Sequence, residues 1–540
     1  MTMKKYWFLL FLLLIQVQAI GQIKFLSRFE IKGEAFDPTF ETMRTDLGLV
    51  SFRTMVTKNF SGERVFQFFL SDKDLNSKGL VELAVRTNFD MIGYDTDGDR
   101  LYVLFAKGST SNSTKYVLEV DLKTNQGLEF SADNLLPSDL VEFLVQDKKA
   151  VFLGTSENRP VLQILDLVDK SLHTVQGIYG NNTQVLQVRK MPELESIEVV
   201  VNRKGQFRNR ELLVLTFDLL GNLYREVKVD QFGDPGQEIL GGLLLADQNY
   251  QQVMIGSYGL NARGNYQGMF IMEINEFGEY NFKLYGLEDF PNFFNYLKEK
   301  QKEKKDQQVL KDLERGKIPP IRNTYTIREV KETEDAFLVY FDQVNIVTSR
   351  GGSRTSTTGP FSEFRYNQEN RMAYTPPNLT NPSSVGGLTP VYIQTEYQYV
   401  SSHFIKVSKD GRVIWDNSAT YGDFATFYPG PFGEIAYVGE DLYHVYAEND
   451  QIIASFFRNG EKKFERMFFE IELPDENQRI RRTDLETLRL VHWYDQYFLL
   501  SGMQSIRYQN EEGLEEVKEV FFLSKFVIDG DLYQPEEEGD

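Results

Sequence analysis

The chain repeats one local pattern along most of its length: a hydrophobic run that ends in a polar residue and is followed at once by a tight turn. Runs of this kind, rich in Val, Ile, Leu, Phe and Tyr and bounded by turn formers, are typical of β-strands. The clearest copies are Tyr116 to Asp121, Val161 to Asp166, Leu212 to Asp218, Met269 to Asn275 and His403 to Ser408. A unit that recurs about every 40 to 50 residues indicates a β-propeller or a solenoid.

One complete unit can be read between Thr183 and Val229. It contains four strand-like runs, at 184–188, 197–201, 212–218 and 223–229. A four-stranded sheet cannot cover both of its own faces, so neighbouring units must stack face to face, as the blades of a propeller do. We therefore predict an all-β, single-domain β-propeller over residues 22–533.

The spacing of the polar strand ends predicts the number of blades. From Asp121 to Asp166 is 45 residues, then 52 to Asp218 and 57 to Asn275, which is one blade per step. The next step, to Ser408, is 133 residues and contains only one further unit, with strands near 324–330 and 336–347, so the excess must be insertions. We predict about eight blades, with seven as the alternative, at 45–85, 89–132, 137–178, 183–230, 237–287, 322–417, 424–474 and 483–533.

A strand-like run near the beginning of the chain, Lys24 to Ile31, lies before the first blade. Propellers commonly close by combining strands from both chain ends in one blade, which removes a free sheet edge. We expect this run to join the last blade beside Val520 to Val527.

Two insertions interrupt the repeat. Residues 290–320 are predicted to be helical, because Pro291 opens a run with few helix breakers that Gly316 and Pro319 end. Its middle, Lys298 to Gln308, has no apolar residue, which is typical of a solvated spacer or a contact surface. We expect docking at one end by Phe293, Phe294, Tyr296 and Leu297, and at the other by Val309, Leu310 and Leu313.

The second insertion, 350–390, is a long loop of the length that is usually functional or disordered.

The first 21 residues predict export. Lys4 and Lys5 precede an apolar run, Tyr6 to Ile15, and polar residues follow it, as in a secretory signal peptide. The run is too short to cross a bilayer, so no transmembrane span is expected. The chain has no cysteine, which excludes a lipid anchor and disulfides. We expect an exported protein in the periplasm or at the cell surface.

The charge limits the partners. The formal net charge is −20, and residues 534–540 form an acidic tail. A field of this sign repels nucleic acid and anionic membrane surfaces, so neither is an expected partner. The chain contains no P-loop and no dinucleotide fingerprint, so no cofactor is expected.

The residue types that usually carry catalysis are scarce. The four histidines, His173, His403, His444 and His492, lie in strand-like runs without metal-ligand spacing. The run Asp95 to Asp99 alternates carboxylates like a calcium loop, but the glycine is misplaced and the terminal acid is missing. We interpret it as a turn, expect no metal site and assign no catalytic residue, although paired carboxylates for glycan chemistry converge only in space.

A contrast of charge marks the two insertions as contact surfaces. Residues 298–317 carry eight basic and five acidic side chains on an otherwise acidic chain, and the loop combines arginines with aromatic residues. Arginine and aromatic residues are enriched in protein-binding hot spots. The candidate partner-binding residues are Phe361, Phe364, Arg365, Tyr366, Arg371, Tyr374, Lys298, Lys302 and Lys305.

Two turn segments, Lys409 to Asn417 (KDGRVIWDN) and Leu122 to Phe130 (LKTNQGLEF), resemble the broad β-propeller group that includes the tryptophan-docking and quinoprotein-like repeats. The resemblance implies a set of blades and transfers no active site. We expect a non-enzymatic scaffold in a cell-envelope or outer-membrane complex, since similar exported propellers serve envelope assembly. The alternatives are a glycan-active hydrolase or lyase, and a ligand-binding sensor without catalysis.

Overall fold

The computed structural model describes residues 22–34, 37–56, 63–108, 110–157, 159–181, 183–204, 210–245, 250–260, 265–348, 395–426, 432–475, 477–510 and 512–529. Within these ranges the strands form eight four-stranded antiparallel sheets, and the predicted fold class, an all-β propeller with eight blades, is confirmed. The expected signal peptide, the 350–390 loop and the 534–540 tail lie outside the described residues. The chain divides into two compact units, 36–432 and 1–35 with 433–540.

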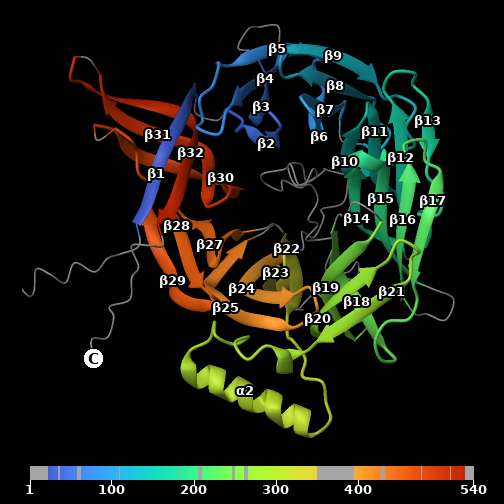
Figure 1. Ribbon diagram of the computed structural model, residues 1–540. Helices are drawn as coiled ribbons and strands as arrows, with labels where there is room; N and C mark the ends of the chain where they lie inside the picture. Colours follow the sequence, from blue (N-terminus) through green and yellow to red (C-terminus); the bar gives the residue numbers. More distant parts are fainter. Residues whose placement is uncertain are drawn as a thin grey trace, which may run out of the picture. The chain divides into compact units, whose positions relative to one another are not determined.

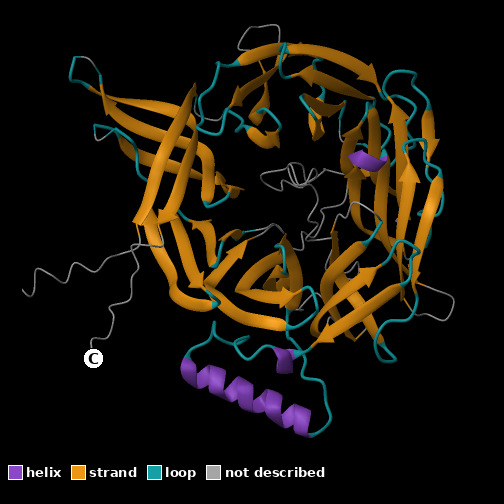
Figure 2. Ribbon diagram, in the orientation of Figure 1, coloured by secondary structure: helices purple, strands orange, loops and turns teal. Residues whose placement is uncertain are grey.

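The first unit contains six sheets that follow one another in chain order, here called blades one to six (Figures 1 and 2). Blade one is β2 (Glu41–Thr45), β3 (Gly48–Val56), β4 (Arg64–Ser71) and β5 (Val81–Val85). Blade two is β6 (Asp90–Asp97), β7 (Arg100–Ala106), β8 (Lys115–Asp121) and β9 (Gln126–Ser131). Blade three is β10 (Asp139–Gln146), β11 (Lys149–Ser156), β12 (Arg159–Asp166) and β13 (Leu172–Thr174).

Blade four is β14 (Thr183–Met191), β15 (Ser196–Lys204), β16 (Arg210–Asp218) and β17 (Leu223–Val229), with a short 3-10 turn, η1 (Pro192–Leu194), between its first two strands. Blade five is β18 (Gln237–Leu245), β19 (Gln252–Leu260), β20 (Asn265–Ile274) and β21 (Tyr280–Tyr285). Blade six is β22 (Thr324–Glu332), β23 (Ala336–Thr348), β24 (Thr395–Ser408) and β25 (Val413–Thr426). Within this unit the first strand of each blade lies on the inside and the fourth on the outside (Figure 1).

The second unit contains blades seven and eight. Blade seven is β26 (Glu434–Val438), β27 (Asp441–Glu448), β28 (Gln451–Arg458) and β29 (Glu461–Glu470). Blade eight combines β30 (Arg479–Tyr494), β31 (Tyr497–Gln509) and β32 (Glu515–Asp529) with β1 (Gln22–Gly33) from the other end of the chain. β1 pairs with β32 from Gln22 opposite Asp529 to Gly33 opposite Glu519. The predicted pairing of 24–31 with 520–527 is therefore confirmed.

The core lies between neighbouring sheets rather than within one. One cluster joins Leu153 and Ile164 of blade three to Val199 and Leu215 of blade four, and another joins Phe270 of blade five to residues of blades four and six. Because both faces of the second and third strands of a blade are covered, these strands are largely hydrophobic and buried, as β7 and β12 are. Burial of apolar area between blades is the main stabilising contribution in a chain without cysteine.

The polar residue that ends each repeated run caps the turn after the third strand of its blade. Asp121 Oδ1 accepts the backbone N–H groups of Lys123 (3.0 Å) and Thr124 (2.9 Å). Asp218 Oδ1 accepts those of Leu220 (2.9 Å) and Asn222 (2.8 Å). Asp166, Asn275 and Ser408 act in the same way in blades three, five and six. The repeat in the sequence therefore corresponds to a local turn in which a side chain accepts backbone hydrogen bonds, which short polar residues do best.

The innermost strand carries a β-bulge at the same register in blades two to six. The extra residue is Ile92, Val141, Leu186, Leu240 and Arg328 in turn. A bulge bends its strand and increases the local twist. Four of these residues are apolar, and blade six alone among the five has a charged side chain at this position.

Candidate functional site

The departure from the repeat at blades five and six is a helical segment between β21 and β22. It contains a 3-10 turn, η2 (Leu287–Asp289), a series of turns, and the helix α2 (Glu299–Glu314). α2 lies outside the sheets of blades five and six (Figure 1), and Gly316, with φ of +67°, follows its C-terminus. The prediction of a helix within 290–320 is confirmed. In the described ranges no helix combines the length and apolar composition needed to cross a bilayer.

Aromatic rings anchor this segment before the helix begins. Phe290 and Phe293 are both buried in the core shared by blades four to six. The ring of Phe293 stacks on the imidazole of His403 in β24, with centroids 4.1 Å apart, and also contacts Tyr325 in β22. His403 is buried, donates to or accepts from Ser401 Oγ at 2.9 Å, and has its pKa lowered to about 3 by burial. A neutral imidazole that packs between aromatic rings is a structural residue, as the sequence indicated.

Three consecutive residues of β25 hold the same segment by hydrogen bonds. The Asp416 carboxylate accepts the backbone N–H of Asn292 at 2.9 Å. Asn417 Oδ1 accepts the side-chain amide of Asn295 at 3.0 Å. Ser418 Oγ donates to the Phe293 carbonyl at 2.9 Å and accepts the N–H of Tyr296 at 3.1 Å.

Asp416 is the titratable residue in this contact. Only 3% of it is exposed. Burial raises the pKa of its carboxyl to about 6, although the hydrogen bonds from Asn292 and the nearby Lys302 favour the charged form. The contact therefore contains a carboxyl group that gains or loses its proton near neutral pH.

The long faces of α2 differ in exposure and in charge. Lys302, Asp306, Val309, Asp312 and Leu313 are half-buried at helical spacing and form the face toward the blades. No residue of the helix is fully buried. The rest of the helix surface is exposed and carries most of the charge, including three glutamates, Glu299, Glu303 and Glu314. We call the exposed residues Lys298, Lys300, Lys304, Lys305 and Lys311 the basic face of the arm, and the segment 286–320 the helical arm.

The three candidate lysines of the helical arm differ in exposure. Lys298 precedes the helix and is exposed, and Lys305 is exposed, whereas Lys302 is half-buried and lies near Asp416. The expected docking of Val309 agrees with its packing against the core. The expected docking of Leu310 was wrong, because its side chain is 60% exposed. A position one residue after Val309 lies about 100° around the helix, on the outward side.

The other candidate contact residues, Phe361, Phe364, Arg365, Tyr366, Arg371 and Tyr374, lie outside the described residues. Blade six, which carries that insertion between β23 and β24, differs from its neighbours in its interior. Arg328 Nε lies 2.8 Å from Asp342 Oδ2, and the two side chains are 3% and 0% exposed. Asp342 Oδ1 also accepts hydrogen bonds from Ser402 (3.1 Å) and Tyr421 (3.0 Å).

Two carboxylates of the run 95–99 connect blade two to blades three and four, and the third forms an ion pair within blade two. Asp95 Oδ2 accepts the backbone N–H of Val145 at 2.7 Å and the ammonium of Lys190 at 2.8 Å. Asp97 accepts the N–H of Asp147 at 2.8 Å, and Asp99 pairs with Lys123 at 2.7 Å. The strand–turn–strand interpretation is confirmed, because β6 and β7 flank a turn between Asp97 and Arg100.

Sequence reasoning missed Asp416, Asn417, His403 and the Arg328–Asp342 pair as parts of one region. The segment WDN at 415–417 was noted only as a turn signature, and its polar residues follow a turn in many copies of the repeat. Nothing in the local sequence shows that Asn292, more than a hundred residues earlier, completes their hydrogen bonds.

Comparison with known proteins finds similarity to solved structures at low sequence identity. No protein-family model matches the chain, and no curated protein matches it in sequence. Among solved structures, the β-propeller domain of the Trilobed protease from Pyrococcus furiosus is 8% identical and covers 80% of this chain and 98% of its own, with a TM-score of 0.32. The polysaccharide lyase Uly1 is 9% identical and covers 81% and 90%, with a TM-score of 0.34. The acylaminoacyl peptidase of Pyrococcus horikoshii is 10% identical with a TM-score of 0.31, and the match covers 79% of this chain and about half of that enzyme (52%).

Proposed function

We propose that the protein is an exported, non-enzymatic β-propeller that serves as a binding scaffold in a cell-envelope or cell-surface complex. The helical arm is its contact element, and its basic face binds an acidic surface of a protein partner. The observation that carries the proposal is the combination of a fixed base and an exposed helix. Aromatic stacking and four hydrogen bonds hold the arm on blade six, yet no residue of α2 is fully buried.

The exposed face of α2 contributes little to the stability of the protein, because it is polar and buries little apolar area. This arrangement is better suited to binding a partner. Because its anchor is rigid, the arm presents its charges in a fixed pattern and loses little conformational entropy when a partner binds. Charge complementarity with an acidic partner would accelerate encounter and favour the correct partner.

The test is co-purification from the native cell envelope with a matched charge control. The arm variant carries Lys300→Glu, Lys304→Glu and Lys311→Glu. The control carries Lys78→Glu, Lys107→Glu and Lys170→Glu, three equally exposed lysines far from the arm in sequence, so both variants change the net charge equally. We expect the wild type and the control to recover the same discrete protein, identified by mass spectrometry, and the arm variant to lose it. Recovery of that protein by all three, or by none, would contradict the proposal.

A further inference from the structure

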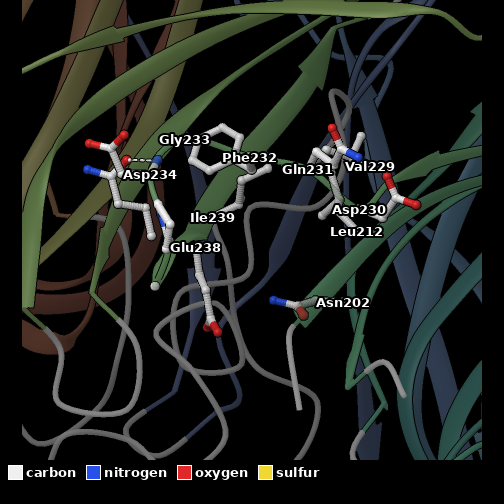
Figure 3. A pocket seen from close by; sticks show the side chains of 13 residues that line it. Asn202, Leu212, Val229, Asp230, Gln231, Phe232, Gly233, Asp234, Glu238 and Ile239 are labelled. Carbon is white, nitrogen blue, oxygen red and sulfur yellow. Dashed lines mark hydrogen bonds between the residues drawn. The ribbon is translucent and has the colours of Figure 1, made fainter. Parts of the chain in front are cut away.

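A pocket of about 390 Å³ lies where blade four connects to blade five. The connection 230–236, between β17 and β18, forms one side. Asn202 at the end of β15 and Leu212 at the start of β16 form another, and Glu238 in β18 lies across from them (Figure 3). A volume of this size suits a small ligand or one long side chain.

The connection is held in shape without a ligand. Gly233 and Gly236 have φ of +60° and +93°, a conformation that glycine adopts without steric cost. Gln237 Oε1 accepts the backbone N–H of Asp234 at 2.8 Å, and its amide donates to Gln267 at 3.0 Å. The ring of Phe232 packs against three aromatic rings of blade five, those of Tyr258, Phe270 and Phe282. The pocket is therefore preformed.

Asn202 is the residue that points to a ligand. Its side chain lines the pocket and only 7% of the residue is exposed. Among the described residues no side chain or backbone group hydrogen-bonds to this amide, although its backbone pairs with Leu212 and Gln184. Figure 3 shows the amide directed into the gap between β15 and Glu238. The amide atoms themselves are not enclosed by the protein, so a group that enters the pocket can hydrogen-bond to them without displacing a protein partner.

The charge of the residues that line the pocket indicates which kind of ligand group it can bind. Asp230, Asp234 and Glu238 line the pocket, and no basic residue is among its described lining residues. The nearest ammonium that pairs with them, that of Lys228, lies 3.7 Å from Asp230 and 3.1 Å from Glu211. The three carboxylates are not gathered into a group that could hold a metal ion. A larger cation with several N–H donors fits both the carboxylates and the amide oxygen of Asn202.

We infer that this pocket binds an organic cation, a guanidinium or ammonium group on a flexible stem. The group enters beside Asn202 and donates to its amide oxygen. The negative charges of Asp230, Asp234 and Glu238 along the pocket favour its positive charge. Its source is either an arginine or lysine side chain of a peptide or a free polyamine. This inference is independent of the helical arm and of any partner that the arm binds.

Titration calorimetry with the full mature chain tests the inference. N-acetyl-arginine amide represents a peptide side chain, spermidine a polyamine, and N-acetyl-glutamine amide is the neutral control. We expect one cationic probe to bind with Kd of about 1 mM or tighter, given its small size. We expect the neutral probe not to bind. Stronger binding of the arginine amide assigns a peptide source, and stronger binding of spermidine assigns a polyamine.

Three variants locate the binding. Asn202→Leu removes the amide and keeps the side-chain size, and the double variant Asp230→Asn with Asp234→Asn removes two exposed charges without touching the core. Each should weaken the cationic probe at least about tenfold, the effect of one lost charged hydrogen bond. Glu276→Gln, an exposed acid in the turn after β20, is the matched control and should leave Kd within about twofold.

Stability separates a binding role of Asn202 from a structural one. If the amide serves a ligand, Asn202→Leu should keep or raise the melting temperature of the free protein while binding is lost. A lower melting temperature with unchanged binding would overturn the inference. So would failure of both cations to bind at 20-fold the expected Kd, or equal binding of the neutral probe.

Discussion

Arg328 distinguishes the interior of blade six from those of blades two to five. In blades two to five the bulge of the innermost strand holds an apolar side chain, and in blade six it holds this arginine, buried against Asp342. A buried ion pair loses much hydration free energy, and its attraction compensates only when the geometry is good and the other polar atoms are satisfied. Here Ser402 and Tyr421 supply further hydrogen bonds to the carboxylate. The pair therefore specifies the interior of this blade rather than adding much stability.

Removal of one partner should destabilise blade six strongly. Arg328→Met leaves the Asp342 carboxylate buried without its counterion, which costs about 3–5 kcal/mol. The double variant Arg328→Met with Asp342→Leu should regain most of that loss. Urea unfolding in a Trp493→Phe background checks this, because Trp415 in β25 is then the reporter in the mature chain. Equal midpoints for the single variant and its parent would contradict the interpretation.

Asp416 should make the attachment of the helical arm depend on pH. Its folded pKa, raised to about 6, lies above the ordinary value of an aspartate, about 3.9, so the folded state holds the proton more tightly than the unfolded state. The stability that protonation provides is complete below pH 4 and is lost as the pH rises through 6. The difference between these two pKa values corresponds to at most about 3 kcal/mol.

Asp416→Asn tests this dependence, because the amide keeps the shape and cannot ionise. The difference in unfolding free energy between the variant and the wild type should be small near pH 4.5 and should favour the variant near pH 7.5. Asn292, Lys302 and Tyr325 face the carboxyl and remain the same in both proteins. A difference that does not change between these pH values would show that Asp416 titrates normally.

At the scale of elements, β1 determines how blade eight ends. The strand covers the edge of β32, and without it a 15-residue strand would expose unpaired backbone groups. Exposed edges of this kind favour association with other chains. β1 also contributes side chains: Arg28 donates to Gln504 at 2.8 Å, and its guanidinium lies 4.3 Å from the ring centre of Phe522.

Deletion of residues 22–33 should therefore lower the unfolding midpoint reported by Trp493 in β30 and should promote oligomers in size-exclusion chromatography. A synthetic peptide of the same sequence, QIKFLSRFEIKG, should restore both the midpoint and the monomer. A peptide with the same residues in scrambled order is the control. If the two peptides act alike, the effect is not strand pairing.

At the scale of the whole molecule, the net charge decides which other surfaces the protein repels at long range. The mature chain lacks Lys4 and Lys5 under the proposed cleavage and is then more negative than −20. This net charge repels polyanions at long range, whereas the basic face of the helical arm acts only within about a Debye length, roughly 8 Å at physiological salt.

We accordingly expect no retardation of a duplex DNA by up to about 10 µM protein at physiological salt, a concentration within the usual range of non-specific dissociation constants, about 1 to 100 µM. The arm variant serves as the control, because its loss of three lysines should change nothing in this assay. A duplex that the wild type retards and the arm variant does not would show that the basic face binds nucleic acid.

The pattern along the chain was enough to predict the number of blades, their approximate limits, the helical arm and the pairing of β1. These depend on alternation, strand length and turn chemistry between near neighbours, as the capped turn after Asp218 illustrates. The three-dimensional contacts of Asp416 with Asn292, of Phe293 with His403, and the place of Asn202 beside the 230–236 connection were not predictable in this way. They join residues distant in sequence, and the bulges that orient the inner strands have no local signature, so only the packing of one blade against the next determines them.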